Sequence, residues 1–368
     1  MTKAAELAKM GEVLTNSQIG GRRNLIINGA MQVAQRATSA TGLGASSSYP
    51  TLDRFKLVND SSNSGRLTMT QDSSGPNGFA NSLKLDCTTA DTSIGSAEVT
   101  ILRYSFEGQD VQQFKKGTSD AEKVTVSFFV KGNASATYTC ELQDNTNGRT
   151  IAQEFSVTTS FTRVILTFNA DTTGTITDDN AERFRFHIFL HGGSNYTGGT
   201  FVSNTWASTT TNQRIGDNQT SFFDSTDRTF FITGIQMEVG EQATPFEHRL
   251  FGEELALCQR YFYVPVNGTS QAFGMGTYYA SNLITMVLDF PTTMRAAPSV
   301  TVANGSNYFV AYGNGQGDAF NTWDNIQRGC PNYIALDVTD DGASGTAGDG
   351  CALATNSSSA YIFCDAEV

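Results

Sequence analysis

The sequence predicts an all-β protein in which a jelly-roll β-sandwich is followed by a smaller C-terminal β-sandwich, with a short N-terminal helix and a short helical connector. Two observations carry this prediction. Apolar and polar residues alternate over short stretches, which is the pattern of strands with one buried face. Turn-forming residues separate these stretches, and the chain contains 35 glycines but only 16% charged residues. This balance fits thin sheets joined by many turns better than a helical core.

Residues 1–21 form the first predicted segment, a peptide for docking or oligomerisation. We expect a short helix over residues 2–14, because Leu7, Met10 and Leu14 share one face at spacings of three and four. This seam is too short to hold an oligomer by itself. Two interpretations stay open: a frayed tail, or a peptide that docks the chain to a larger particle or sets the register of a trimer.

Residues 22–244 are predicted to form the jelly roll. Its clearest alternating stretches are 124–130, 138–142, 164–168 and 184–190. Turn signals rich in Asn and Gly separate them at 131–133, 145–148 and 171–174. Asn and Gly tolerate the positive φ of tight turns. Several short strands at this spacing indicate a sandwich or jelly roll.

Residues 245–264 interrupt the strand pattern and are predicted to be a helical connector. Leu255, Cys258 and Phe262 share a helical face between Pro245 and Pro265. Residues 265–368 return to the strand pattern and are predicted to form the smaller sandwich, the candidate receptor-binding head. Its predicted strands lie within 277–279, 283–290, 299–302, 332–337 and 360–364.

Charge and hydropathy exclude several classes of partner. The net charge is −12, so a nucleic acid would be repelled rather than bound through Lys and Arg. No apolar run reaches the length of about 18 residues that a membrane-spanning helix needs. The first residues lack the apolar core of a signal peptide, so we expect synthesis in a cytoplasm.

The six cysteines are expected to be free, buried thiols, because cytoplasmic synthesis disfavours disulfides. They occupy positions 87, 140, 258, 330, 351 and 364. No Cys-x-x-Cys occurs, so no zinc cluster is expected from their spacing. A disulfide among the last three cysteines stays open. We expect no cofactor.

The sequence gives no pattern of a catalytic site, so we expect a protein that is not an enzyme. The chain has three histidines and no His-Glu-x-x-His or Gly-x-Ser-x-Gly. The acids that a glycosidase would pair all lie in turn-like contexts, where exposure is the default; they are Asp178, Asp179, Asp340, Asp341 and Asp349. The acidic stretch 337–342 does not match a calcium loop, and no metal site is expected.

Aromatic residues beside polar side chains indicate a glycan-binding site. A sugar presents an apolar face and a rim of hydroxyls, which a flat ring and neighbouring amide or carboxylate groups can bind. Trp206 lies in a polar loop. The region 304–328 supplies the larger candidate set, which is Tyr308, Tyr312, Asn314, Asp318, Asn321, Trp323 and Asp324. The alternative is that Trp323 and Tyr308 fill a small core.

Several segments resemble a group of phage tail-fibre and receptor-binding proteins. They are the run Arg23–Arg36, the stretch Leu52–Phe55, residues 106–110 with 124–132, and above all Ile232–Phe262. The resemblance covers about residues 22–263, with a weaker match at 290–298. The first domain is also similar to jelly-roll carbohydrate-binding modules, which open with an Asn-Leu-x-x-Asn-Gly run and often hold a structural calcium. Gln32 and Thr233-Gly234 stand near the places of the acidic calcium ligands, so the resemblance implies the fold and not the metal.

The resemblance implies a homotrimeric tail fibre in the virion. Its N-terminus would dock to other virion structural proteins, and its C-terminal domain would bind a host surface glycan without cleaving it. Three rivals stay open: a capsid-bound decoration fibre, a tailspike-type polysaccharide depolymerase, and a structural trimer with no ligand.

Overall fold

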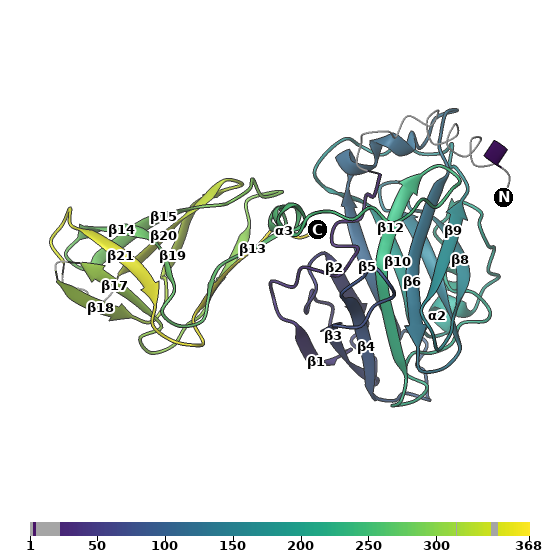
Figure 1. The fold of residues 1–368 in the computed structure, drawn as a ribbon, viewed down its shortest axis with the longest axis horizontal. Helices are drawn as coiled ribbons and strands as arrows, with labels where there is room; N and C mark the ends of the chain where they lie inside the picture. Colours follow the sequence, from purple (N-terminus) through teal and green to yellow (C-terminus); the bar gives the residue numbers. More distant parts are fainter. Residues whose placement is uncertain (1–2, 5–22, 314, 340–344) are drawn as a thin grey trace. The chain divides into compact units, whose positions relative to one another are not determined.

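The computed structural model describes residues 3–4, 23–313, 315–339 and 345–368. The chain divides into two compact units, which are Met1–Phe251 with Val368 (unit 1) and Gly252–Glu367 (unit 2). Each unit is built from antiparallel sheets, which confirms the all-β prediction (Figure 1). Leu7, Met10 and Leu14 of the predicted N-terminal helix lie outside the described residues, as do Asn314, Asp340 and Asp341.

Unit 1 contains two six-stranded sheets with the orders β1-β3-β4-β12-β6-β9 and β11-β8-β7-β10-β5-β2. The first sheet consists of β1 (Ser39–Leu43), β3 (Arg66–Asp72), β4 (Ser82–Thr89), β12 (Thr229–Val239), β6 (Val124–Gly132) and β9 (Thr162–Phe168). The second consists of β11 (Ala207–Ser208), β8 (Arg149–Val157), β7 (Ala136–Asp144), β10 (Glu182–Gly192), β5 (Val99–Glu107) and β2 (Phe55–Asn59). Short helices lie between strands at η1 (Gly108–Phe114), α2 (Ser194–Thr197) and η2 (Thr211–Gln213).

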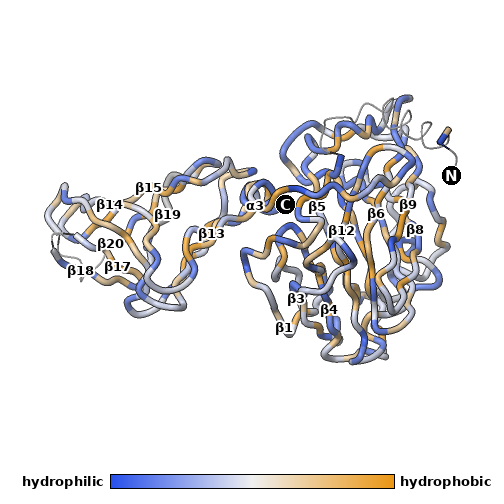
Figure 2. Tube along the Cα trace, viewed as in Figure 1, coloured by the Kyte–Doolittle hydropathy of each residue, from blue (hydrophilic) through white to orange (hydrophobic). Residues whose placement is uncertain are grey.

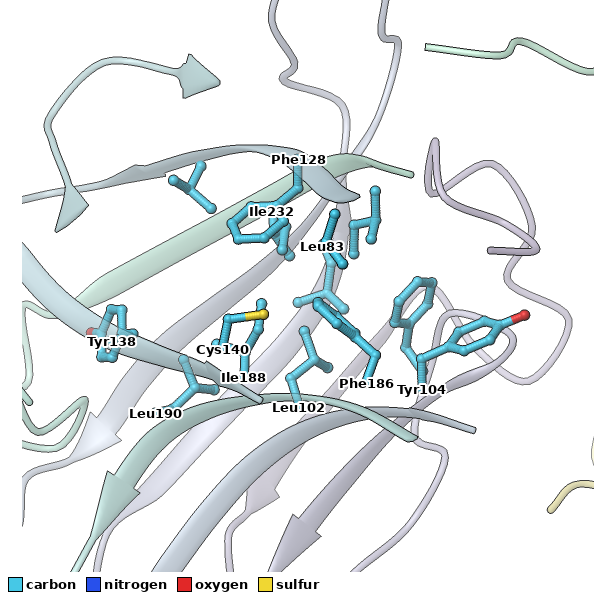
Figure 3. Packing of buried hydrophobic residues seen from close by; sticks show 14 of the residues in the cluster. Leu83, Leu102, Tyr104, Phe128, Tyr138, Cys140, Phe186, Ile188, Leu190 and Ile232 are labelled. Carbon is cyan, nitrogen blue, oxygen red and sulfur yellow. The ribbon is translucent and has the colours of Figure 1, made fainter. Parts of the chain in front are cut away.

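The core of unit 1 lies between these two sheets. Figure 3 shows Phe128 and Ile232 of the first sheet pointing toward Leu102 and Phe186 of the second, and all four are fully buried. Alternate residues on these strands point away from the core, so hydrophobic and hydrophilic colours alternate along the tube in Figure 2. The alternation in the sequence therefore marks which side chains face the core of the sandwich.

The two segments with the strongest family resemblance meet at the edge of this core. The Asn24 side chain donates to the carbonyl of Ile235 at 3.1 Å and accepts from the backbone N–H of Met237 at 3.1 Å. The Leu25 N–H donates to the Met237 carbonyl at 3.0 Å. Asn24 is buried, so these bonds satisfy polar groups that water cannot reach.

Residues after β12 add to these bonds between the first and last segments of unit 1, which are together called the clasp. One Glu247 carboxylate oxygen accepts the backbone N–H groups of Arg23 and Asn24 at 2.7 and 2.8 Å. Glu238 accepts both the N–H and the hydroxyl of Thr244 at 2.8 Å. Asn24 in the opening segment and Glu247 in the closing segment therefore hold the first and last segments of unit 1 together.

Unit 2 is a smaller sandwich of a three-stranded sheet, β13-β22-β16, and a seven-stranded sheet, β18-β17-β21-β14-β15-β20-β19. The first contains β13 (Phe262–Asn267), β22 (Tyr361–Asp365) and β16 (Ser299–Val302). The second contains β18 (Gln316–Phe320), β17 (Phe309–Gly313), β21 (Gly350–Thr355), β14 (Ala272–Ala280), β15 (Leu283–Asp289), β20 (Tyr333–Thr339) and β19 (Asn325–Cys330). The helix α3 (Phe251–Gln259) lies inside the predicted connector and is shorter than it.

The thiols follow the sequence expectation except at Cys330, which is half-buried. All six cysteines are free, and five of them are buried. Burial raises the pKa of Cys87 to about 11 and that of Cys364 to about 12, so both are protonated at neutral pH. Among the described residues, no helix is long and apolar enough to cross a membrane.

Candidate functional site

The outer face of the seven-stranded sheet in unit 2 carries a group of exposed apolar and aromatic side chains, here called the tyrosine face. Its members and their exposed fractions are Met275 (68%), Tyr279 (75%), Val287 (57%), Tyr312 (54%) and Tyr333 (39%). Exposed side chains of this size on one sheet face are the feature that marks a binding surface, whereas isolated ones are ordinary.

Strand register places part of the tyrosine face in one row. Tyr312 pairs with Ala352, and Ala352 pairs with Met275. Since Gly276 pairs with Met286 on the next strand, Met275 lies beside Val287, which in turn pairs with Ala335. Neighbouring strands are about 4.8 Å apart, so this apolar row across five strands is about 19 Å long.

A polar row runs parallel to the apolar one. Thr277 pairs with Thr285, and Thr285 pairs with Asp337. These residues stand two positions along their strands from the apolar row, which separates the rows by about 7 Å. The face therefore offers an apolar track with hydroxyl and carboxylate groups at its side.

The same alternation that exposes this face buries the other side of each strand. Tyr278, Ile284 and Leu336 point inward and are buried in the unit 2 core. Gly317 stands opposite Tyr312 on β18, and a Cβ at this glycine would come within 3.1 Å of the Tyr312 ring. The glycine therefore leaves space for the tyrosine ring beside it.

Trp323 requires a correction to the predicted binding set. It is 4% exposed and packs against Phe320, Phe309 and Phe273, with ring centroids 5.1, 6.4 and 6.2 Å away. A ring enclosed on this many sides cannot stack on a sugar. Tyr308 is half-buried and packs against the same core, so the core-filling alternative describes both residues.

The polar members of the predicted set hold loops and neighbours. Asp318 accepts the Tyr278 hydroxyl at 2.6 Å, and burial together with this carboxylate raises the pKa of Tyr278. Asn321 accepts the backbone N–H of Asn307 at 2.9 Å. Asp324 accepts that of Thr339 at 2.7 Å. Among the described members of the set, Tyr312 is the one that belongs to the tyrosine face.

Trp206 lies in unit 1, whereas the other predicted residues that the structure describes belong to unit 2. Its indole N–H donates to the Asn169 carbonyl at 2.7 Å, and its ring packs against the unit 1 core near Phe184. The Lys116 ammonium lies 5.3 Å from the ring centroid. Trp206 is thus half-buried and closes one end of this core.

Unit 1 has a polar row of its own on the outer side of its second sheet. Arg103, His187 and Glu141 follow one another across β5, β10 and β7. The His187 ring bonds Glu141 at 2.9 Å through Nδ1 and accepts from Arg103 at 2.9 Å through Nε2. Burial lowers the pKa of His187 to about 3 although the Glu141 carboxylate opposes this. With both ring nitrogens engaged, His187 is not available as a general base.

Sequence reasoning missed Met275, Tyr279, Val287 and Tyr333 as members of a binding face. The signal was present in part, because Met275 and Tyr279 lie at even spacing on one strand. The sequence does not show whether these two side chains face the core or the outer side of the sheet.

Comparison with known proteins gave matches in structure alone. No family model matches the chain, and no curated protein matches it. A family 11 carbohydrate-binding module of Clostridium thermocellum is 10% identical, covering 56% of this chain and 97% of that one with a TM-score of 0.27. A xylan-binding domain from Paenibacillus barcinonensis is 12% identical, covering 60% and 96% with a TM-score of 0.28.

A third structure comes from a phage. The enzymatically active domain of tailspike protein 4 of bacteriophage CBA120 is 10% identical, covering 59% of this chain and 21% of that one with a TM-score of 0.29. TM-scores of this size do not bear on what this chain binds or catalyses.

Proposed function

We propose that this protein binds a glycan without cleaving it and that the tyrosine face of unit 2 is the binding surface. The observation that carries the proposal is the apolar row beside the polar row on an open sheet face. The apolar faces of successive sugars would lie on Tyr312, Met275 and Val287. Their hydroxyls would reach Thr277, Thr285 and Asp337. Tyrosine suits such a surface because it joins an apolar ring to a polar tip.

The proposal extends to a phage virion fibre, a homotrimeric tail fibre that mediates host attachment. Support comes from the sequence resemblance over residues 22–263, whose most specific segments form the clasp of unit 1. Residues 1–21 would dock to other virion proteins, and the protein would be made in the host cytoplasm. Three copies of one shallow face act together, which raises avidity without a deep pocket.

A non-catalytic role agrees with the state of the buried acid–base groups. Glu141 is bound by Arg214 at 2.5 and 2.9 Å as well as by His187. These contacts hold the pKa of Glu141 below its ordinary value against the effect of burial. A glycosidase needs one carboxyl group that stays protonated near neutral pH, and Glu141 is the opposite case.

The test is binding of the full chain to host surface polysaccharide by biolayer interferometry, with product length measured in parallel. Tyr312→Ala and Tyr279→Ala should each weaken binding by about 2- to 13-fold, the size of one aromatic contact of about 0.5–1.5 kcal/mol. Ile165→Ala, at an exposed residue of unit 1, is the matched control and should bind as the unchanged chain does. Shortened polysaccharide chains would instead indicate a tailspike-type depolymerase. Unchanged binding by both tyrosine variants would exclude the tyrosine face as the binding surface.

A further inference from the structure

Three potential metal ligands meet inside unit 1, far from the tyrosine face in the sequence. Asp91 and Glu98 lie in the segment between β4 and β5, and His191 lies near the end of β10. All three are buried, with 6%, 4% and 0% exposure. One ligand atom from each lies within 4.8 Å of the others, and this is the one such group of three among the described residues.

The cluster contains more negative charge than its neighbours offset. His191 Nε2 lies 3.4 Å from Glu98 Oε2. Among the described residues, His191 is the ion-pair partner of Glu98. Neither Glu98 nor Asp91 has a Lys or Arg ion pair in the part of the chain that the structure describes. Asp91 Oδ2 is buried and has no hydrogen-bond partner, which is costly for a carboxylate.

Further bonds hold the three side chains in place. Glu98 Oε2 accepts the Gly95 N–H at 2.9 Å, and a carboxylate oxygen has a second lone pair for a metal ion. His191 Nδ1 bonds Ser221 Oγ at 2.8 Å, which directs Nε2 toward Glu98. Asp91 uses its other oxygen to accept the Ser93 N–H at 3.0 Å, and its own N–H donates to the Phe223 carbonyl at 2.8 Å. Outer partners of this kind fix the ring and carboxylate orientations at metal sites in proteins.

We infer that Asp91, Glu98 and His191 Nε2 bind a divalent transition-metal ion of the zinc class. One imidazole nitrogen with two carboxylates suits zinc, whereas calcium prefers oxygen ligands throughout. Ligand bonds of about 2.1 Å put the ligand atoms of a tetrahedral site about 3.4 Å apart. The His191–Glu98 pair already has this separation, and a movement of Asp91 from within 4.8 Å would bring in the third protein ligand. A solvent molecule would take the fourth position.

The surroundings provide a route to the site and a role for the ion. Ser221, the partner of His191, also lines a cavity of about 330 Å³ together with Gly192 and Ile94. An ion here would fasten the 91–98 segment to β10, and through Asp91 and Ser221 to the 221–223 segment. This is a structural staple, and it is independent of the glycan proposal.

The experiment uses the full chain, stripped with chelator and titrated with Zn²⁺, Mn²⁺ or Ca²⁺ by calorimetry and thermal unfolding. We expect one Zn²⁺ per chain and a rise in the Tm of unit 1 of about 5 to 11 °C at 100-fold excess over Kd. Asp91→Asn and His191→Gln should each lower Zn²⁺ affinity at least about tenfold. Asp86→Asn, on neighbouring β4, is the matched control and should bind normally.

Absence of saturable Zn²⁺ binding by the unchanged chain would overturn the inference, whatever the variants do. Binding that persists equally in Asp91→Asn and His191→Gln would also overturn it, because the ion would then sit elsewhere. Binding of Ca²⁺ in preference to Zn²⁺ would refute the assigned ligand set. If Asp91→Asn does not fold, Co²⁺ bound to the unchanged chain supplies a visible spectrum that reports nitrogen and oxygen ligation directly.

Discussion

Lys116 is a buried cation whose removal should destabilise unit 1 strongly. Its ammonium lies 2.6 Å from Asp144 and 2.9 Å from Asp171, and it donates to the carbonyls of Thr173 and Gly174 at 2.7 and 3.1 Å. The side chains of all three charged residues are at most 4% exposed. Lys116→Met keeps most of the aliphatic stem and removes the charge.

The size of the effect follows from what each carboxylate keeps. Asp171 keeps its two bonds from Arg149, at 2.7 and 2.9 Å. Among the described residues, Asp144 keeps hydrogen bonds from Thr146 and Asn147 only. Arg149 stands opposite it on β8 but pairs with Asp171, so Asp144 becomes a buried charge without a direct ion pair. Breaking a buried pair in this way costs about 3–5 kcal/mol. For a unit of this length, that lowers the Tm by about 6 to 20 °C.

Differential scanning calorimetry of the full chain measures this shift, and the unfolding of unit 2 serves as an internal reference. Lys115→Met is the matched control, because Lys115 is the next residue and pairs with Glu122 at the surface. It should leave the Tm of unit 1 unchanged, as surface pairs contribute little. A Lys116→Met protein that unfolds at the temperature of the unchanged chain would refute the reasoning.

Three further changes test other parts of the account. Gly29→Ala would place a Cβ 2.2 Å from the Ile235 carbonyl oxygen, so chemical denaturation should show a loss of unit 1 stability. An unchanged denaturation midpoint would contradict the close packing of the clasp. Burial would raise the pKa of Glu182, but bonds from Arg185 and Ser105 outweigh it and lower this pKa from 4.5 to about 2. Its contribution to stability is therefore present above pH 4.5 and lost as the pH falls toward 2, and Glu182→Gln should flatten that part of a Tm–pH profile. Trp323→Ala should lower the free energy of unfolding of unit 2 by about 3–5 kcal/mol and lower its Tm in calorimetry. An unchanged transition would contradict the core position of Trp323.

The strands were predictable because their signal is local. The stretches 124–130 and 184–190 alternate in the sequence and form most of β6 and β10. Each strand buries every second residue against the facing sheet, so a few neighbouring residues suffice to predict it. The clasp lies in the two segments that carry the family resemblance, but its pairing was not predicted, because the bonded partners are more than 200 residues apart in the sequence.

The site was predictable only in part, because exposure depends on distant strands. Tyr312 and Trp323 lie in similar polar surroundings in the sequence, yet one is on the outer face and the other in the core. The sequence does not reveal that Phe273, Phe309 and Phe320 enclose Trp323. The Asp91–Glu98–His191 cluster shows no motif spacing for the same reason, since Glu98 and His191 are 93 positions apart.

Methyl NMR of methionine-labelled protein tests the central claim, glycan binding on the tyrosine face. The chain has eight methionines, and Met275 is exposed on this face while Met69, Met237 and Met286 are buried. Host polysaccharide should shift the Met275 methyl signal in a saturable way and leave the buried three in place, with Met275→Leu assigning the signal. Saturable binding that leaves the chemical shift of the Met275 methyl group unchanged would contradict glycan binding on the tyrosine face.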